Sequence, residues 1–470
     1  MDTLSPVHSP ERLADFGDDT AARSTSQAVR DYLSRLRAGE LGSIPALLGL
    51  AVLVTVFASV SDVFLSLANL ANLLSQSAGT MIISMGLVFV LITAEIDVSA
   101  GTASGLTAAV LALHYTSDGN LLTGMGTTVF YTFIVVLCVA IAAAVAMRLW
   151  AAAVLSAVPI FLMLAGFTGN PWIEMLLAVT VGGAIGTLTG FLVAKVRIPS
   201  FVITLALFLT WQGVILKLIG TGGVLGIRTS PILDNVANGN LDVWQSWLLY
   251  ALVTAGYSTV TIGRHLARTR RGNHTQPMPL ILLKIAAVVV LGALATWLLT
   301  LNRSTNPGHH LSGVPYVVPV VLVLLVAGTY VLSRTKYGLH IYAVGGNAEA
   351  ARRAGVNVDR IKGSVFVVSS CFAAIGAIVY SSKVGSVDPS AGGLNTLLFA
   401  VGAAVIGGTS LFGGRGRLSN AVLGGLVLAV VENGLGLVDQ PAAIVSIVTG
   451  LVLALAAAVD ALSRRRAQAF

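Results

Sequence analysis

The chain has 470 residues, of which 56% are hydrophobic and only 10% carry a charged side chain, and its mean hydropathy is +0.87. This composition excludes an ordinary soluble domain and is typical of a protein that crosses the membrane many times. The formal net charge of +8 could suggest a nucleic-acid partner. Most of the 28 Lys and Arg residues, however, lie after every second apolar segment, which is where the cytoplasmic loops of a membrane protein lie. The positive charge is therefore explained by membrane orientation, and we expect no nucleic-acid partner.

Residues 1–43 carry mixed charge with several Ser and Pro, and they lack the apolar core and cleavage site of a signal peptide. We therefore expect a retained, disordered cytoplasmic tail. Residues 44–463 are predicted to form an all-α transmembrane domain of about 14 apolar segments, some of them broken or re-entrant. These segments are predicted at 44–60, 69–92, 97–113, 126–147, 149–167, 172–194, 200–219, 246–262, 280–300, 316–332, 363–382, 394–412, 417–436 and 441–460.

The positions of the basic residues predict how these segments are oriented. Basic residues are frequent in the N-terminal tail, in loops at 263–279 and 337–362, and in a C-terminal tail at 464–470. When these parts are placed inside the cell, few basic residues remain outside, namely Arg228, Arg303 and Lys383. We therefore expect both termini in the cytoplasm and a multi-pass protein in the lipid bilayer of the plasma or inner membrane.

Polar side chains within two of the apolar segments are candidates for a solute pathway. Asn69, Asn72 and Gln76 lie at spacings of three and four, on one helical face, and Trp211 and Gln212 lie in a later segment. Amides donate and accept hydrogen bonds, and an indole ring offers a flat apolar surface. Such groups suit a neutral, hydroxyl-rich solute. Hydrogen bonding between helices is the alternative interpretation.

Carboxylates at membrane depth are costly and therefore informative. Glu95, Asp97 and Ser99 interrupt two apolar runs, as a broken helix beside a cavity would, although an ordinary cytoplasmic turn is the alternative. Glu432 and Asn433 lie within an apolar segment, where a carboxylate needs a partner or water. For Glu432 and Asn433 we favour a position facing a cavity.

A short sequence occurs twice. Residues 97–101 read Asp-Val-Ser-Ala-Gly and residues 388–392 read Asp-Pro-Ser-Ala-Gly. In the predicted topology the two copies lie on opposite sides, so we expect an inverted repeat and add Asp388 and Ser390 to the candidate pathway residues. Chance recurrence in a chain rich in Gly, Ala and Ser is the alternative. Glu174, in contrast, lies at a segment end and is expected at the membrane interface.

The loop at 337–362 contains the signals of one short amphipathic helix. Asn347 is a good N-cap, Glu349 falls in the first turn, and Gly355 ends the helix. A polar helix between two long apolar segments is typical of a docking site for another protein, whereas a solvated loop is the alternative. The candidate docking residues are Gly345, Gly346, Asn347, Glu349, Ala350, Ala351, Arg352, Arg353 and Gly355.

Several motifs of enzymes and cofactor sites are absent from the sequence. There is no Gly-x-x-x-x-Gly-Lys-Ser/Thr phosphate loop, so the chain is not an ATPase of that type. There is no His, Cys and Asp cluster with metal-ligand spacing and no Gly-x-Ser-x-Gly elbow. We expect no catalytic residues, no cofactor and no metal.

Ordered segments carry a resemblance to a known family. They are residues 94–101, 194–205, 337–347, 350–352, 355–358 and 407–411, followed by Gly413, Gly414 and Gly416. Together they resemble the permeases of binding-protein-dependent ATP-binding-cassette (ABC) importers, in the ribose, xylose and galactoside branch, and are most similar to the xylose permeases. The resemblance covers residues 64–463, and the additional stretch at 246–300 is also similar to the xylose type.

The resemblance implies a transport subunit and its partners. Two copies of the chain, or one copy and a related permease, would form the pathway. An ABC ATPase subunit would dock on the loop around Glu349, and an extracytoplasmic sugar-binding protein would deliver xylose or a related pentose or hexose. A rigid helix in the loop could convert closure of the ATPase into movement of the joined spans.

The chain departs from the family pattern in two places. Leu397 and Phe399 replace an acidic pair, and Gln212 replaces an arginine. These changes indicate either a lost internal ion pair or a pathway altered for another solute. A self-sufficient secondary sugar carrier, with Glu95, Asp97 or Glu432 as its proton-coupling group, is the alternative function, and a non-transporting scaffold closed at 395–400 is a third.

Overall fold

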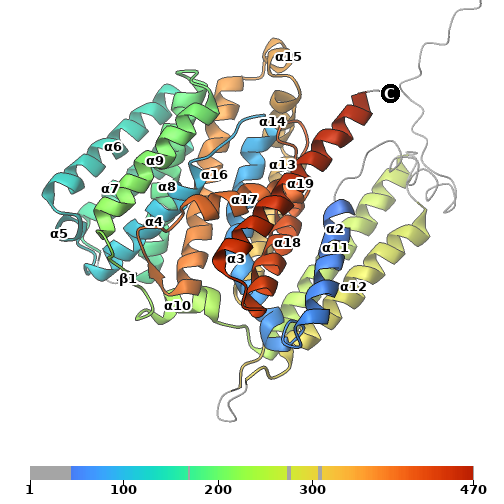
Figure 1. Cartoon of the computed structure of the whole chain (residues 1–470). Helices are drawn as coiled ribbons and strands as arrows, with labels where there is room; N and C mark the ends of the chain where they lie inside the picture. The colour runs from blue at the N-terminus through green and yellow to red at the C-terminus, as the bar shows by residue number, and fades with distance from the viewer. Residues whose placement is uncertain (1–43, 168–169, 272–276, 305–309, 469–470) are drawn as a thin grey trace, which may run out of the picture. The chain divides into compact units, whose positions relative to one another are not determined.

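The computed structural model describes residues 44–167, 170–271, 277–304 and 310–468. The expected tail at 1–43 and part of the expected basic loop, residues 272–276, lie outside the described residues. The described residues form helices and one small antiparallel sheet, in which Leu225 pairs with Val387 (Figure 1). The chain is thus mostly helical, as an all-α membrane protein should be.

The elements follow one another in this order: α2 (Ile44–Val60), α3 (Leu67–Ile92), α4 (Ala100–Thr116), α5 (Leu121–Met125), α6 (Thr127–Ala146), α7 (Trp150–Leu164), α8 (Pro171–Ala194), α9 (Ser200–Ile219), β1 (Leu225–Gly226), α10 (Pro231–Asn238), α11 (Val243–Arg270), α12 (Met278–Thr300), α13 (Val317–Arg334), α14 (Lys336–Gly346), α15 (Ala348–Arg353), α16 (Val358–Val384), β2 (Ser386–Val387), α17 (Leu394–Ile406), α18 (Leu418–Leu437) and α19 (Ala442–Gln468).

Eight of the described helices are long and apolar enough to cross a membrane, namely α3, α6, α8, α9, α12, α13, α16 and α18. Four of the about 14 spans expected from the sequence fold as helices of fewer than 18 residues, namely α2, α4, α7 and α17. The helices α4 and α17 have 17 and 13 residues. At 1.5 Å per residue these helices reach only about 26 and 20 Å, less than the about 30 Å of a bilayer core. α4 begins three residues after the start of its expected segment, and α17 ends at Ile406, before the end of its expected segment.

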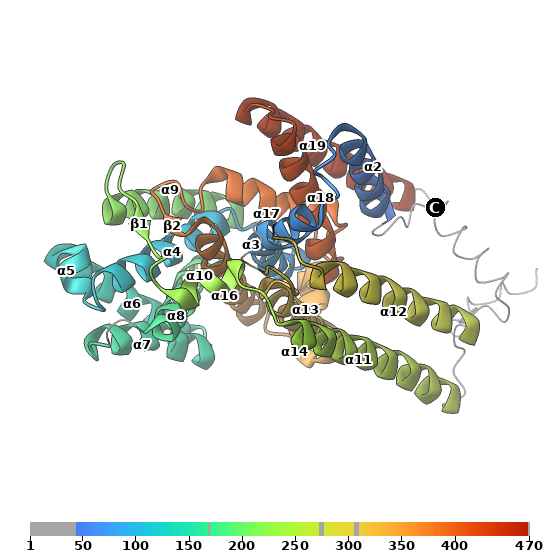
Figure 2. The same cartoon turned by 90° about the horizontal axis from the view of Figure 1, so that it is seen from below.

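Contacts divide the chain into two compact units. Residues 247–297 belong to the first and contain most of α11 and α12. These two helices lie side by side (Figure 2), and the Tyr250 hydroxyl donates to the Val289 carbonyl at 3.0 Å. Residues 44–246 and 298–468 belong to the second unit, which contains every candidate site residue.

Closely packed small residues form the centre of the second unit, where α3 and α8 both pack against α16. A Cβ atom added at Gly86 would lie 2.8 Å from the Ser369 carbonyl oxygen, and one at Gly182 would lie 2.6 Å from that of Ser370. Glycine at these positions lets the helix backbones approach, because lipid provides no hydrophobic drive for helix association.

The helix pairings of the second unit have a two-fold pattern. α16 packs against α4 and α8, while α3 packs against α17 and α18; likewise α4 packs against α9, and α17 against α19. These pairings are therefore symmetric. If α3, α4, α8 and α9 are exchanged in this order for α16, α17, α18 and α19, each pairing in the list becomes another pairing in the list. α3 and α16 run antiparallel, since Gly79 lies against Gly376 while Gly86 lies against Ser369.

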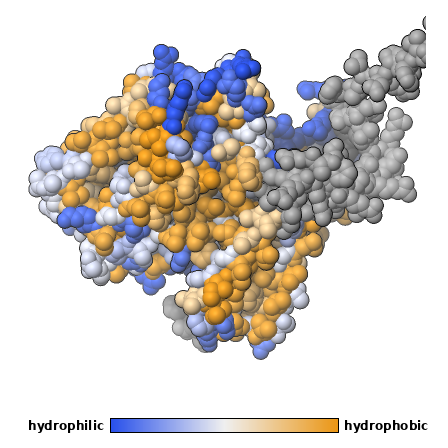
Figure 3. Space-filling model, turned by 45° about the horizontal axis from the view of Figure 1, so that its top comes forward, coloured by the Kyte–Doolittle hydropathy of each residue, from blue (hydrophilic) through white to orange (hydrophobic). Residues whose placement is uncertain are grey.

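Much of the surface is apolar. Figure 3 shows hydrophobic residues over most of the visible face, with hydrophilic residues gathered along its upper edge. Phe201, Leu205 and Leu209 are exposed along α9, and Val323 and Val326 along α13. Exposure of this kind is expected of helices that face lipid or another membrane subunit.

Candidate functional site

The first break, residues 93–99, separates α3 from α4 and contains three of the predicted site residues. Asp97 is only 1% exposed. One of its oxygens accepts hydrogen bonds from the backbone nitrogen and the hydroxyl of Ser99, at 3.1 and 2.7 Å, and the other accepts from the Ser369 hydroxyl on α16 at 3.2 Å. Both oxygens of the Asp97 carboxyl group therefore have hydrogen-bond partners, as a buried polar group requires.

The first residues of α9 complete the first break. The Ile96 amide donates to the Ser200 hydroxyl at 3.2 Å, and the Val98 amide donates to the Thr204 hydroxyl at 3.1 Å. Backbone amides outside a helix need such partners at membrane depth, because lipid supplies none. Two hydroxyl side chains of α9 thereby stabilise a non-helical segment between two apolar helices.

Glu95 has a charged partner that lies 267 residues away in sequence. The Lys362 ammonium group, near the start of α16, donates to the Glu95 carboxylate, and these side chains are 25% and 12% exposed. The pair lowers the cost of placing either charge beside apolar helices. The pair also connects the first break to α16.

The second break, residues 385–393, lies between α16 and α17 and has the same local geometry as the first. Asp388 accepts hydrogen bonds from the backbone nitrogen and the hydroxyl of Ser390, at 2.7 and 2.6 Å. Asp388 is half-buried and Ser390 is exposed. The Gln212 side chain on α9 donates to the Pro389 carbonyl at 2.6 Å. Thus Asp388, Ser390 and Gln212 lie together, and unlike Asp97 the Asp388–Ser390 turn is accessible.

The two breaks meet at glycine residues. A Cβ atom at Gly101 would lie 2.8 Å from the Gly392 carbonyl oxygen, and one at Gly105 would overlap the Ala391 carbonyl. Leu397, which occupies one position of the missing acidic pair, is buried against Gly101. The repeated sequences are therefore close in space as well as similar in local geometry.

The remaining polar candidates on α3 and α18 separate into two groups. Asn433 and Asn69 each donate to the other side chain at 2.9 Å, which is the interhelical hydrogen bonding considered as an alternative for Asn69. Asn72, Gln76 and Glu432 are half-buried, and within the described part of the chain their side chains make no hydrogen bond. These three side chains are free to bind a solute or water.

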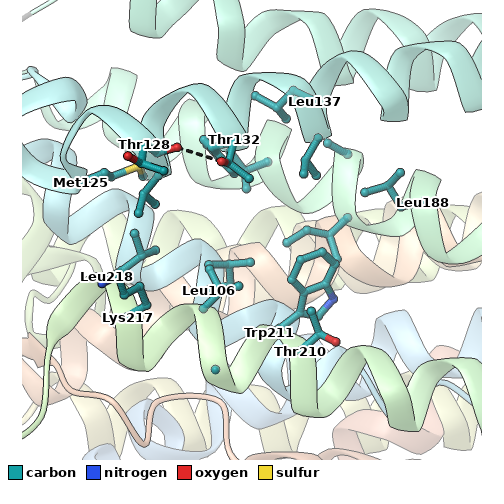
Figure 4. Close-up of a pocket in the computed structure, with 18 residues that line it drawn as sticks. Leu106, Met125, Thr128, Thr132, Leu137, Leu188, Thr210, Trp211, Lys217 and Leu218 are labelled. Carbon is teal, nitrogen blue, oxygen red and sulfur yellow. Dashed lines mark hydrogen bonds between the residues drawn. The ribbon is translucent and has the colours of Figure 1, made fainter.

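Trp211 and Gln212 project from different sides of α9, because Gln212 contacts the second break whereas Trp211 does not. Trp211 lines a cavity of about 360 Å³ between α4, α6, α8 and α9, together with residues such as Leu106, Leu137 and Leu188 (Figure 4). The indole nitrogen has no hydrogen-bond partner among the described residues. The lining offers few polar groups besides the threonine hydroxyls, so this cavity does not suit a sugar, which needs several hydrogen bonds.

The predicted polar helix is present as α15 and is confirmed in its local detail. The Asn347 side chain accepts from the Ala350 amide at 2.9 Å, and Gly355 has a positive φ of 85° after the helix end. Glu349 pairs with Arg353 at 3.3 Å. Ala351 is buried, whereas the exposed residues are Gly346, Asn347, Glu349, Ala350, Arg352, Arg353 and Gly355. The candidate docking face is therefore polar and accessible.

A second helix, α14, supports α15. The Tyr342 hydroxyl donates to the Gly416 carbonyl at 2.7 Å, and the Tyr337 hydroxyl lies 2.8 Å from the Ser364 hydroxyl of α16. Burial raises the pKa of Tyr337 to about 12, so its hydroxyl remains protonated at neutral pH. α14 is thus joined both to the glycine-rich loop at 407–416 and to α16.

The sequence does not reveal the side chains that bind the first break, or the partner of Glu174. Lys362, Ser369 and Thr204 were not singled out, although each is a polar residue in or beside an apolar segment, which is a weak signal. Glu174 lies in the first turn of α8, at a segment end as expected, and it is completely buried and lies 2.6 Å from His114. Nothing near Glu174 in sequence indicates that His114 is its partner.

Comparisons with known proteins identify the relatives of the chain. The family model described as "Branched-chain amino acid transport system / permease component" matches residues 149–457. The chain is 31% identical to the xylose transport system permease protein XylH of Escherichia coli K12 over 406 residues, 86% of this chain and 87% of the relative. XylH of Haemophilus influenzae is 30% identical, covering 89% and 96%. The ribose import permease protein RbsC of E. coli K12 is 28% identical, covering 93% and 98%. No solved structure matches the chain.

Proposed function

The chain belongs to the permease-component family of transport systems, and from this premise we propose that it forms the membrane pathway through which an ABC importer takes up a monosaccharide. It is a multi-pass membrane transport component and not an enzyme. The choice of a sugar rests on one observation: the chain is 31% and 30% identical to two xylose permeases over most of both chains. Xylose or a related pentose or hexose is the substrate.

The two breaks and the accessible amides near them form the pathway in this proposal. Support comes from Asp388 and Ser390 in the second break, to which Gln212 is bonded, and from Asn72, Gln76 and Glu432, which have no partner among the described residues. Carboxylate and amide groups can exchange hydrogen bonds with sugar hydroxyls. The other pathway candidates have a structural role in this conformation. Trp211 lies in apolar surroundings, and the side chains of Glu95, Asp97, Ser99 and Asn433 already have hydrogen-bond partners.

An inverted repeat is part of the proposal. The two-fold pattern of helix pairings, the antiparallel α3 and α16, and the shared Asp–Ser turn geometry all support it. With both termini in the cytoplasm, α15 faces the cytoplasm and docks an ABC ATPase subunit. An extracytoplasmic sugar-binding protein delivers the solute, and the exposed apolar faces accommodate lipid and a second copy of the chain or a related permease.

Uptake of radiolabelled xylose and ribose into proteoliposomes tests the proposal. The liposomes contain the chain, a candidate ATPase subunit and a candidate binding protein from the same organism, and internal or external ATP. We expect ATP-dependent uptake that Glu349→Arg abolishes, together with loss of ATPase co-purification, because a reversed charge disrupts the exposed polar face. The matched variant Asp62→Arg reverses an exposed carboxylate before α3 and should retain the ATPase subunit.

Two results would change the conclusion. Uptake by the chain alone, indifferent to ATP and to Glu349→Arg, would identify a secondary carrier with Glu432 as the first residue to test. Binding of both partners without uptake of any sugar would favour the scaffold.

A further inference from the structure

α15 is joined at each end to a helix that contacts the first break. α14 ends at Gly346, directly before the N-cap of α15, and α16 begins at Val358, shortly after α15 ends. α14 and α16 are therefore the two covalent routes by which a displacement of α15 can reach the membrane domain. Both routes converge on residues 92–95.

The first route passes through Gly345. A Cβ atom at Gly345 would overlap the Ile92 carbonyl, the last of α3, and would lie 2.9 Å from the Gly414 nitrogen. The Gly414 nitrogen itself donates to the Ile92 carbonyl at 2.9 Å. The Ile92 carbonyl is thus enclosed between α14 and the glycine-rich loop at 407–416. The neighbouring Gly346 has no atom within 4 Å of its Cβ position.

The same loop also contacts the first break from its other side. A Cβ atom at Gly413 would lie 2.7 Å from the Ala94 side chain, and Ala94 has a positive φ of 61°. The Tyr342 hydroxyl on α14 donates to the Gly416 carbonyl. Backbone groups of α14, of the loop and of the α3 terminus are therefore in direct contact, with no flexible side chain between them.

The second route passes through Lys362. Arg352 on α15 lies 3.7 Å from Asp359 in the first turn of α16, and Lys362 follows one turn later. Lys362 donates to Glu95 in the first break. A displacement of α15 along or across its axis therefore changes the position of Glu95 through α16 as well as that of Ile92 through α14.

We propose that the contact between Gly345 and the Ile92 carbonyl, assisted by the Lys362–Glu95 pair, transmits movement of α15 to the first break. This inference rests on the proposed function, since it assigns the mechanical link between the ATPase-docking helix and the pathway. Gly345 and Lys362 are positioning residues. Packed backbone contacts transmit displacements because protein interiors are nearly incompressible and rearrange between discrete arrangements. Movement of the first break then reaches α9, because Ile96 and Val98 in the break are hydrogen-bonded to Ser200 and Thr204.

Gly345→Ala and Gly49→Ala form a matched pair of variants. Both replace a helical glycine, in α14 and α2 respectively, but only the methyl group at residue 345 meets backbone atoms, since no atom lies within 4 Å of the Cβ position at Gly49. The reconstituted importer is assayed for xylose and ribose uptake and for ATP hydrolysis in the same vesicles. For Gly345→Ala we expect uptake per ATP hydrolysed to fall about tenfold while the ATPase subunit stays bound, and for Gly49→Ala we expect no change.

Two milder variants keep the inference testable if Gly345→Ala fails to reach the membrane. Tyr342→Phe removes only the hydroxyl that binds the Gly416 carbonyl, and Lys362→Met removes the charge that binds Glu95. Each should lower uptake per ATP about threefold. Unchanged uptake per ATP in the folded variants, or loss of uptake and hydrolysis in equal proportion, would overturn the inference. Absence of ATP-dependent uptake in the unmodified protein would instead reject the proposed function.

Discussion

His114 Nδ1 lies 2.6 Å from a carboxylate oxygen of Glu174, and both side chains are completely buried. The pair joins the end of α4 to the first turn of α8. The other polar atoms of the two side chains, His114 Nε2 and Glu174 Oε1, have no hydrogen-bond partner among the described residues. A pair of this kind is tolerated only while both members are present, because either one alone would be a buried polar group without a partner.

Glu174→Ala should therefore be strongly destabilising. We expect a loss of about 3–5 kcal/mol, because His114 is left without its partner in a dry environment. Thermal unfolding in detergent measures the effect as a fall in Tm. Glu349→Gln, which alters an exposed pair on α15, serves as the control and should cost less than about 1 kcal/mol. Equal Tm values for the two variants would show that the His114–Glu174 pair does not stabilise the fold.

The Asn69–Asn433 pair predicts non-additive mutations. Asn69→Leu and Asn433→Leu should each cost about 1–2 kcal/mol, since each leaves the partner amide with fewer hydrogen bonds, and the double variant should cost less than their sum. A double-mutant cycle on Tm measures this coupling. Asn72→Leu is the control: Tm should stay nearly unchanged, while sugar uptake should fall if Asn72 contacts the solute as we propose. Strict additivity would contradict the interaction.

Gly105 should not tolerate a larger side chain. The methyl group of Gly105→Ala would meet the Ala391 carbonyl of the second break, so we expect a cost of about 1–3 kcal/mol and reduced uptake. Gly213→Ala on α9 is the control, since no atom lies within 4 Å of its Cβ position. Both variants are compared by Tm and by uptake. A variant Gly105→Ala that behaves like Gly213→Ala would contradict the close approach of α4 and the second break.

Gln212 should affect sugar uptake more than stability. Gln212→Leu removes the hydrogen bond to the Pro389 carbonyl and so loosens the Asp388–Ser390 turn. We expect KM for uptake to rise about fivefold, corresponding to a hydrogen bond of about 1 kcal/mol. Trp211→Phe, one residue earlier in the apolar cavity, should change KM less than about twofold. The opposite order of the two effects would place the pathway on the Trp211 side of α9.

Local patterns in the sequence were sufficient for α15. Its N-cap, its acidic first turn and its terminal glycine lie within nine residues of one another, so the interactions that define this helix are short-range and could be predicted. The first break could also be located, because Glu95, Asp97 and Ser99 interrupt apolar runs. The partners of Glu95 and Asp97 could not be predicted, since Lys362 and Ser369 lie about 270 residues further along the chain.

Composition and hydropathy alone identify a polytopic membrane protein, because lipid imposes a strong and nearly uniform demand for apolar helices. The contacts within the candidate site, in contrast, depend on the tertiary structure. The burial of Glu174 against His114, the enclosure of Asp97 by α16, the meeting of Gly101 with Gly392 and the contact of Gly345 with Ile92 all join residues that are distant in sequence. Their positions depend on how helices pack, and a glycine or a carboxylate in an apolar segment does not reveal which backbone or side chain it meets.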